Sequence, residues 1–269
     1  MPLQRARWAS IGAGVMATAL FSGAAERGGL NPADVIFTDT DESKLGVLSK
    51  KGFQTTPDNA AAARLADFVL LAVKPGQAIA ALRGIAPQLD GKVLVSVCAG
   101  ITVAAMRAVL PNGTRIVRVM PNLPVTVGAG ASAIAMPEGM DAKSAEIVTA
   151  LFSRSGYAVP LDEGLLNAVT AVSGSGPGYF FRFAAAMQAE AEQQGIPPEA
   201  ARNLIAHTMG GAARMLMESG ASAKELANHV ATPGGTTQAA FQVLDGRGFD
   251  ESVRKAMARC AERARELGR

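Results

Sequence analysis

The sequence predicts an α/β protein in which a doubly wound parallel sheet is followed by an all-α C-terminal half. Two observations predict the sheet: short apolar runs alternate with helical stretches up to about residue 160, and a glycine-rich turn separates the first run from the first helix. A third observation divides the chain, because strand-like runs end near Leu161 and only helical patterns follow. We therefore expect one domain at residues 1–160 and a helical domain at residues 161–269.

Five apolar runs in the first half are expected to form the strands. Parallel strands that helices cover on both faces read as nearly continuous hydrophobic stretches, and such runs lie at 8–11, 35–38, 67–73, 93–97 and 115–119. Helices are expected at about 15–27 and 41–51. Gly28 and Gly52 would end them, because glycine adopts the left-handed conformation that closes a helix.

Helical patterns fill the second half. Residues 179–194 and 197–219 read as two long helices, and a proline pair opens the second, since proline is tolerated in the first turn. Ser222 and Glu225 have the spacing of a capping box for a third helix. The final helix carries an apolar stripe at steps of three and four from Val253 to Leu267. That stripe suits either a subunit interface or an ordinary intrachain face.

Composition and charge exclude several classes of function. The formal charge of +3 is small for 269 residues, and no lysine- and arginine-rich run suited to nucleic acid occurs. No apolar stretch reaches the length of a membrane span, and the N-terminal segment is too weakly apolar for a signal peptide. Cys98 and Cys260 lie far apart without metal-ligand spacing, as suits a reducing compartment. We expect a cytoplasmic protein that binds neither nucleic acid, membrane nor metal ion.

The glycine-rich turn after the first predicted strand has the pattern of a dinucleotide-binding loop. Its residues are Gly12, Ala13, Gly14, Val15, Met16 and Ala17. The first glycine permits the tight turn, the second lets backbone amides approach a pyrophosphate, and the final alanine lets the helix pack on the sheet. The positive end of that helix favours the anion. Because a strand precedes the turn and a helix follows it, the pattern predicts a Rossmann-like domain that binds NAD or NADP.

The choice between the two cofactors depends on the end of the second predicted strand. Asp39 lies where an acidic residue usually bonds the adenosine ribose and repels a 2′-phosphate, which favours NADH. Thr38, Thr40 and Lys44 could instead hold the phosphate of NADPH, with Asp39 turned away. A third interpretation leaves Asp39 as a solvated loop acid while Asp41 caps the next helix. The sequence therefore leaves the cofactor open.

Three further segments follow predicted strands, at the edge where open α/β sheets bind ligands. They are Val73-Lys74-Pro75, Ala99-Gly100-Ile101 and Met120-Pro121-Asn122. The residues expected to line the nicotinamide end of the cofactor are Val73, Lys74, Pro75, Ala99, Gly100 and Asn122. Lys74 is better explained as a strand-end lysine that packs near the cofactor than as a catalytic lysine.

Two segments of the second half place small residues and hydroxyl groups directly before helices. They are Val169–Tyr179, which contains Ser173-Gly174-Ser175-Gly176-Pro177, and Ala231–Thr237, which contains Pro233-Gly234-Gly235-Thr236-Thr237. Unpaired amides at a helix start suit a carboxylate, which takes several short hydrogen bonds and favours a positive helix end. Taken singly, either segment is explained equally well as a close helix crossing with a hydroxyl cap.

Together with the glycine loop and the strand-end segments, these two motifs resemble those of pyrroline-5-carboxylate reductases, in the same order over nearly the whole chain. The resemblance implies reduction of 1-pyrroline-5-carboxylate to L-proline with NADPH or NADH, the last step of proline biosynthesis. It also implies a C-terminal domain like that of 6-phosphogluconate dehydrogenase. Helical domains of this family interlock into homodimers, often joined into homodecamers.

The resemblance assigns roles to single residues. Thr237 matches the threonine whose hydroxyl bonds the ring nitrogen of the substrate, and it is the catalytic candidate. Asn59 falls where the family often contacts the cofactor ribose, although Asp58-Asn59 equally suits a helix cap. Thr38–Thr40 lacks the asparagine-arginine pair found in many relatives, so a preference for NADPH does not carry over. The residues that would hold the substrate are Ser175, Gly176, Gly234, Gly235, Thr236 and Thr237.

Two other functions share this architecture. A 3-hydroxyacid dehydrogenase needs a lysine early in the helix after its glycine motif, and no lysine occurs between Lys143 and Lys224. A nucleotide-sensing protein without turnover would keep the dinucleotide loop, and an intact Thr237 counts against it. The reductase needs no strong general acid, because a cyclic imine is partly protonated near neutral pH and orientation with hydrogen bonding lowers the barrier.

Overall fold

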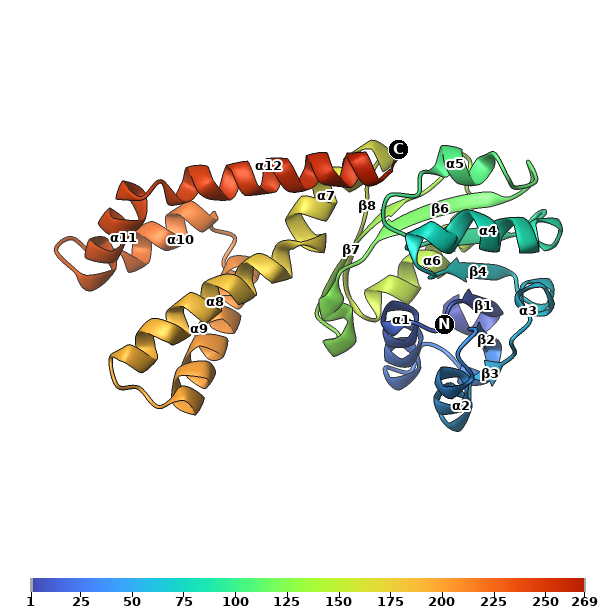
Figure 1. The fold of residues 1–269 in the computed structure, drawn as a ribbon, viewed down its shortest axis with the longest axis horizontal. Helices are drawn as coiled ribbons and strands as arrows, with labels where there is room; N and C mark the ends of the chain where they lie inside the picture. Colours follow the sequence, from blue (N-terminus) through green and yellow to red (C-terminus); the bar gives the residue numbers. More distant parts are fainter. Residues whose placement is uncertain (1, 269) are drawn as a thin grey trace. The chain divides into compact units, whose positions relative to one another are not determined.

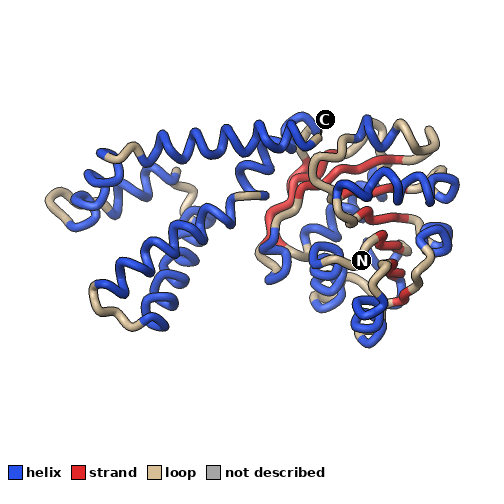
Figure 2. Tube along the Cα trace, in the orientation of Figure 1, coloured by secondary structure: helices blue, strands red, loops and turns tan. Residues whose placement is uncertain are grey.

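The computed structural model describes residues 2–268, which form two compact units. The first unit extends to Pro177 and also contains the segment from Cys260 onward, and the second unit is Gly178–Arg259. Among the described residues, strands occur in the first unit, and the second is built of helices and their connections (Figure 1, Figure 2). The predicted α/β fold with an all-α portion is confirmed.

An eight-stranded sheet forms the centre of the first unit, with strand order β3-β2-β1-β4-β5-β6-β7-β8. The first six strands run parallel, β7 is antiparallel to β6, and β8 is parallel to β7. The order of the strands reverses at β1, which pairs with β2 on one side and with β4 on the other. Open α/β sheets bind ligands at such a switch point. The strands are β1 (Trp8–Ile11), β2 (Val35–Thr38), β3 (Gln54–Thr55), β4 (Phe68–Leu71), β5 (Val93–Ser96), β6 (Arg115–Met120), β7 (Gly130–Ala135) and β8 (Gly156–Pro160).

Helices cover both faces of this sheet. Side chains alternate along each strand, so Trp8 packs into one apolar cluster while Ala9 packs into the other. The first cluster includes α1 (Val15–Glu26), α2 (Glu42–Lys50) and α6 (Ala142–Ser153). The second includes α3 (Asn59–Leu65), α4 (Pro75–Ile85) and α5 (Val103–Arg107). Short 3-10 helices lie at η1 (Pro2–Arg5), η2 (Pro32–Asp34), η3 (Ala86–Gln88) and η4 (Leu123–Val127).

All five predicted strands are confirmed, whereas β3, β7 and β8 were missed. β7 consists of glycine, alanine and serine apart from Ile134, so it lacks the β-branched and aromatic residues that mark a strand. β8 lies at the edge of the sheet and is only partly buried, and β3 has two residues. The predicted helix ends are confirmed, with Gly28 at φ 71° and Gly52 at φ 86° just beyond α1 and α2.

The chain changes from sheet to helix after Pro160, through η5 (Glu163–Leu165), α7 (Leu166–Val169) and the π-helical turn η6 (Thr170–Gly174). Leu166 is buried with Ala133 and Ala135 of β7, so this segment belongs to the first compact unit, whose N-terminal stretch continues to Pro177. The predicted boundary at residues 160 and 161 marks the end of β8. The division into a cofactor-binding domain before this boundary and a substrate-binding domain after it stays a prediction.

The second unit contains three whole helices, α9 to α11, and the larger part of two more, α8 and α12. Ser222 and Glu225 form the predicted capping box, in which the Ser222 side chain accepts from the Glu225 amide and the Glu225 carboxylate accepts from the Ser222 amide. Within residues 2–268, no helix combines the length and apolar character needed to cross a membrane. The helices are α8 (Gly176–Gln193), α9 (Pro198–Glu218), α10 (Ala223–Val230), α11 (Thr236–Gly246) and α12 (Phe249–Leu267).

Candidate active site

The dinucleotide loop connects β1 to α1, and glycine is needed at its two glycine positions for different physical reasons. Gly12 has φ 101°, and a Cβ there would lie 2.6 Å from the carbonyl oxygen of Ala72, so only glycine fits. Gly14 is the N-cap of α1 with an ordinary φ of −73°, and a Cβ there would lie 4.0 Å from that same oxygen. The space beside Gly14 is therefore open, as the close approach of a pyrophosphate requires.

Asp39, at the end of β2, holds this loop. Its carboxylate accepts hydrogen bonds from the amide of Ala13 at 2.9 Å and the amide of Asp41 at 3.0 Å, and the Lys44 ammonium lies 3.4 Å away. Burial raises the pKa of Asp39, but these hydrogen bonds and the Lys44 charge outweigh it, and the pKa lies below its ordinary value. The side chain is only 14% exposed, so the interpretation of Asp39 as a solvated loop acid is wrong. Asp41 does cap α2, by accepting from the Ser43 amide.

Asn59 lies in the first turn of α3, close to the end of β2. Its side-chain carbonyl accepts a hydrogen bond of 2.5 Å from the buried Thr38 hydroxyl. Asp58 is the N-cap of α3, with its carboxylate bonded to the amides of Ala60 and Ala61. The capping role therefore belongs to Asp58, and the contact of Asn59 with the cofactor ribose stays a prediction.

The loops after β4 and β5 carry the other predicted cofactor residues. Lys74 is exposed and is the N-cap of α4, with Pro75 at its first position. The Cys98 thiol lies 3.3 Å from the carbonyl oxygen of Val73 and so ties the two loops together, and burial raises its pKa. Ala99 is exposed, and Gly100 has φ 79°, where its missing side chain leaves room for the backbone of the last turn of α12.

Asn122 is buried and joins two motifs that the sequence predicted separately. Its amide nitrogen donates to the carbonyl oxygen of Ser173 at 3.1 Å, and its amide oxygen accepts from the Ala131 amide at 2.8 Å. The neighbouring Met120 methyl lies 2.7 Å from where a Cβ on Gly174 would be. The Met120–Asn122 segment thus holds the Ser173–Gly176 turn in place.

Ser175 ends the π-helical turn. Its amide donates to the carbonyl oxygen of Thr170 at 2.8 Å, and its hydroxyl oxygen lies 3.1 Å from the sulfur of Cys260 in α12. Gly176 is buried at the start of α8. π-helical turns within helices often occur at functional sites.

The remaining predicted substrate residues belong to the second unit, at the start of α11. Gly235 is the N-cap, and Thr236 and Thr237 occupy the first turn, whose amides have no partner within the helix. The amide of Gly234 donates to the Gln238 side chain at 2.8 Å, and that of Gly235 donates to the Thr232 carbonyl at 2.9 Å. The amides of the two glycines are therefore engaged within the loop.

An arginine that sequence reasoning passed over, Arg118, lies inside β6 and forms a buried ion pair. Arg118 is 6% exposed and lies 3.1 Å from the Glu163 carboxylate, which also accepts from the Val103 amide at 2.8 Å. This pair ties β6 to the starts of α5 and η5. The available signal was an arginine in the middle of an apolar strand, because a buried charge needs a partner.

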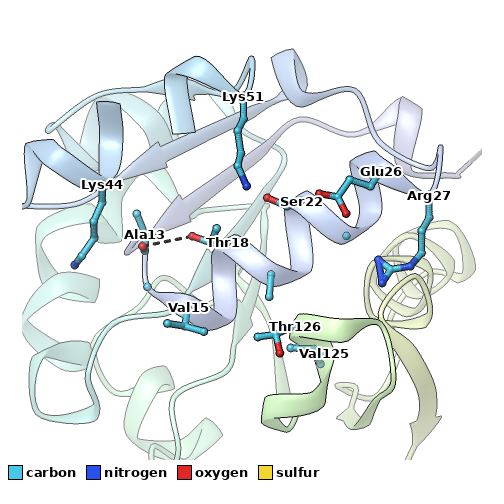
Figure 3. Close-up of a pocket in the computed structure, with 13 residues that line it drawn as sticks. Ala13, Val15, Thr18, Ser22, Glu26, Arg27, Lys44, Lys51, Val125 and Thr126 are labelled. Atoms are coloured by element: carbon cyan, nitrogen blue, oxygen red, sulfur yellow. Dashed lines mark hydrogen bonds between the residues drawn. The ribbon is translucent and has the colours of Figure 1, made fainter. Parts of the chain in front are cut away.

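A groove of about 610 Å³ extends along α1 from the dinucleotide loop (Figure 3). Lys44 and Lys51 lie on one side of α1 and Thr126 lies on the other, and Thr18 bonds back to the Ala13 carbonyl at 3.5 Å. The volume of the groove is in the range found for small-molecule binding sites. Gly14 and Lys44 both line the groove, and the sequence had already placed each of them near a phosphate of the cofactor.

Comparison with known proteins identifies the family. A family model described as pyrroline-5-carboxylate reductase dimerisation matches residues 163–267, and one described as NADP oxidoreductase, coenzyme F420-dependent, matches residues 7–100. The pyrroline-5-carboxylate reductase of Methanosarcina acetivorans is 36% identical over 261 residues, which are 96% of this chain and 97% of that protein. The chain belongs to the pyrroline-5-carboxylate reductase family.

Solved pyrroline-5-carboxylate reductase structures share the fold. The Coxiella burnetii enzyme has a TM-score of 0.92 at 34% identity, covering 98% of this chain and 99% of that chain. The Plasmodium falciparum enzyme, solved with NADP bound, has a TM-score of 0.90 at 24% identity, covering 99% and 100% of the two chains, and its likeness concerns the fold.

As a member of the pyrroline-5-carboxylate reductase family, this chain is an NAD(P)-dependent oxidoreductase. The residues present fit the cofactor, because Gly12 closes the turn and Gly14 leaves room for a pyrophosphate. The family's dimerisation region occupies residues 163–267, so the chain forms an oligomer. Its substrate is a small molecule.

Proposed function

We propose that this protein reduces 1-pyrroline-5-carboxylate to L-proline with NADPH or NADH. One observation supports this choice of substrate. The reductase dimerisation model matches residues 163–267, which contain both the Ser173–Gly176 turn and the Gly234–Thr237 loop. In the second segment, the first-turn amides of Thr236 and Thr237 have no partner within α11 and suit a small amino-acid-like anion, whereas the first segment offers the Ser175 hydroxyl, because its Ser175 amide is already bonded to Thr170.

The proposed mechanism divides binding between the two motifs. The first-turn amides of Thr236 and Thr237 hold the carboxylate at the positive end of α11, because the amides of Gly234 and Gly235 are already bonded within the loop. Ser175 adds a hydroxyl donor. The Thr237 hydroxyl bonds the ring nitrogen and keeps the imine proton there, where it remains on the product amine.

Orientation supplies most of the remaining chemistry. When held by the Gly12–Ala17 loop, a reduced nicotinamide cofactor would supply the hydride for the imine carbon. The contribution of Asp39 and Gly12 is to fix the loop that carries the cofactor, and that of Thr237 is to fix the ring nitrogen. Since the protonated imine already accepts hydride, no side chain has to act as a strong acid.

We further propose a homodimer, or a homodecamer built from such dimers, as the family resemblance implies. Large apolar side chains are exposed in the second unit, among them Phe180 at 62%, Phe181 at 63% and Met217 at 74%. Side chains of this size favour burial at an interface. A cytoplasmic location is proposed from the separate thiols of Cys98 and Cys260.

A steady-state assay tests the proposed activity. We expect 1-pyrroline-5-carboxylate to drive oxidation of NADPH, of NADH or of both, with L-proline as the product. The control omits the imine substrate, and a Gly14→Val variant, whose side chain occupies the pyrophosphate space, should abolish turnover. Binding of either dinucleotide without any oxidation would support a nucleotide sensor instead.

A further inference from the structure

Cys260 contacts the one hydroxyl of the Ser173–Gly176 turn that the proposed function assigns to the substrate. Its sulfur lies 3.1 Å from the Ser175 hydroxyl oxygen, and both side chains are partly buried. Cys260 begins the part of α12 that belongs to the first compact unit, together with Ser175. The contact therefore lies within one unit.

The rest of the turn is already fixed by other groups. The amide of Ser175 donates to Thr170, and the carbonyl oxygen of Ser173 accepts from Asn122. The last turn of α12 is fixed as well, because its backbone packs against Gly100. The Ser175 hydroxyl can thus rotate on a backbone that hydrogen bonds hold, and Cys260 approaches it from within α12, whose last turn packs against Gly100.

A serine hydroxyl has one proton, so its direction decides what the group can do. If Ser175 donates to the sulfur of Cys260, it has no proton left for a carboxylate. If the thiol of Cys260 donates to the Ser175 oxygen, the hydroxyl proton is free to point at the anion. The distance allows either direction.

We propose that Cys260 is a positioning residue, whose thiol donates to Ser175 and so aims the Ser175 hydroxyl at the substrate carboxylate. The inference rests on the proposed function. It assigns Cys260 no contact with substrate or cofactor, and its effect passes through Ser175 alone.

Three replacements of Cys260 separate hydrogen bonding from volume. Cys260→Ser keeps a donor, Cys260→Val keeps the bulk without one, and Cys260→Ala removes both. We expect the valine and alanine variants to raise the KM for 1-pyrroline-5-carboxylate by about threefold to tenfold, the change that one ordinary hydrogen bond gives. The serine variant should stay within about twofold of wild type, and the KM for the dinucleotide should not change in any of them.

A double-mutant cycle tests whether Cys260 acts through Ser175. The Ser175→Ala/Cys260→Ala variant should have the same KM for the imine as Ser175→Ala alone, because the group that Cys260 aims is gone. Additive effects of the two changes, or a wild-type KM in Cys260→Val, would overturn the proposal. Since these comparisons need a wild-type protein that turns over 1-pyrroline-5-carboxylate, a failure of the proposed function would appear first, as an inactive wild type.

Discussion

The carboxylate of Asp39, just after β2, accepts a hydrogen bond of 2.9 Å from the amide of Ala13, in the loop that follows the neighbouring strand β1. The acid at the end of β2 is therefore part of the dinucleotide loop before any ribose is bound. Replacing it should affect the fold of the loop as well as cofactor choice.

Asp39→Asn should lower the free energy of unfolding by about 1–2 kcal/mol at pH 7, because a charge-assisted bond to Ala13 and the attraction of Lys44 are lost. The pKa of Asp39 lies below its ordinary value of 3.8, so its contribution is complete above that value and is lost as the pH falls through the folded pKa. Denaturant unfolding of both proteins between about pH 7 and pH 3 measures this. A difference that grows on acidification would contradict the assignment.

Gly12→Ala and Gly14→Ala should fail for different reasons. A Cβ on Gly12 meets the Ala72 carbonyl oxygen at 2.6 Å, and the φ of this residue is 101°. We therefore expect Gly12→Ala to lower the free energy of unfolding by about 1–3 kcal/mol and also to weaken dinucleotide binding. A Cβ on Gly14 meets only ordinary contacts, so stability should change by less than about 1 kcal/mol while dinucleotide affinity falls. Thermal unfolding and a dinucleotide titration separate the two. Equal destabilisation by both changes would count against the proposed use of Gly14.

Asn122→Ala should destabilise the protein by about 2–3 kcal/mol, because the partly buried Ser173 carbonyl and Ala131 amide both lose their partner. The KM for the imine should rise in parallel, since the Ser173–Gly176 turn loses its attachment to the end of β6. Asn122→Asp is the matched control: it can still accept from Ala131 but cannot donate to Ser173. An aspartate variant with wild-type stability and KM would show that the bond to Ser173 is unimportant.

Thr237→Ala should lower kcat by about tenfold or more with little change in dinucleotide affinity, because it removes the proposed contact to the ring nitrogen. Thr237→Ser retains the hydroxyl and should recover most of the activity. Thr236→Ala, which leaves the backbone amides in place, serves as the neighbouring control. Full activity in the alanine variant at position 237 would remove Thr237 from the mechanism.

Phe181→Glu should shift the protein toward smaller species in sedimentation velocity, because a charge replaces a side chain that is 63% exposed in the single chain. Tyr157→Glu provides a control in the first unit, where the ring is 68% exposed on the edge strand β8. An unchanged distribution for Phe181→Glu would place the interface elsewhere.

The sequence predicted the parts of the fold that have strong periodicity. Central strands such as Val93–Ser96 are buried on both faces and are recognisable as apolar runs, and the glycine loop has a local pattern. β7 was not recognisable, because its alanines and serine lack strand propensity and its pairing with β6 is set by tertiary packing. Residue types at the site were predictable from motifs, but the bond from Asn122 to Ser173, 51 residues apart, follows no local spacing.

The π-helical turn at Thr170–Gly174 has a consequence for how this family can vary. A wide turn accommodates one more residue than an α-helical turn, and each α-helical residue rotates the chain by about 100°. Deleting a single residue between positions 170 and 174 would therefore convert the segment to regular helix and swing Ser175 by about a quarter of a turn. Chain length at this point should be far more constrained than the identity of the residues that fill it.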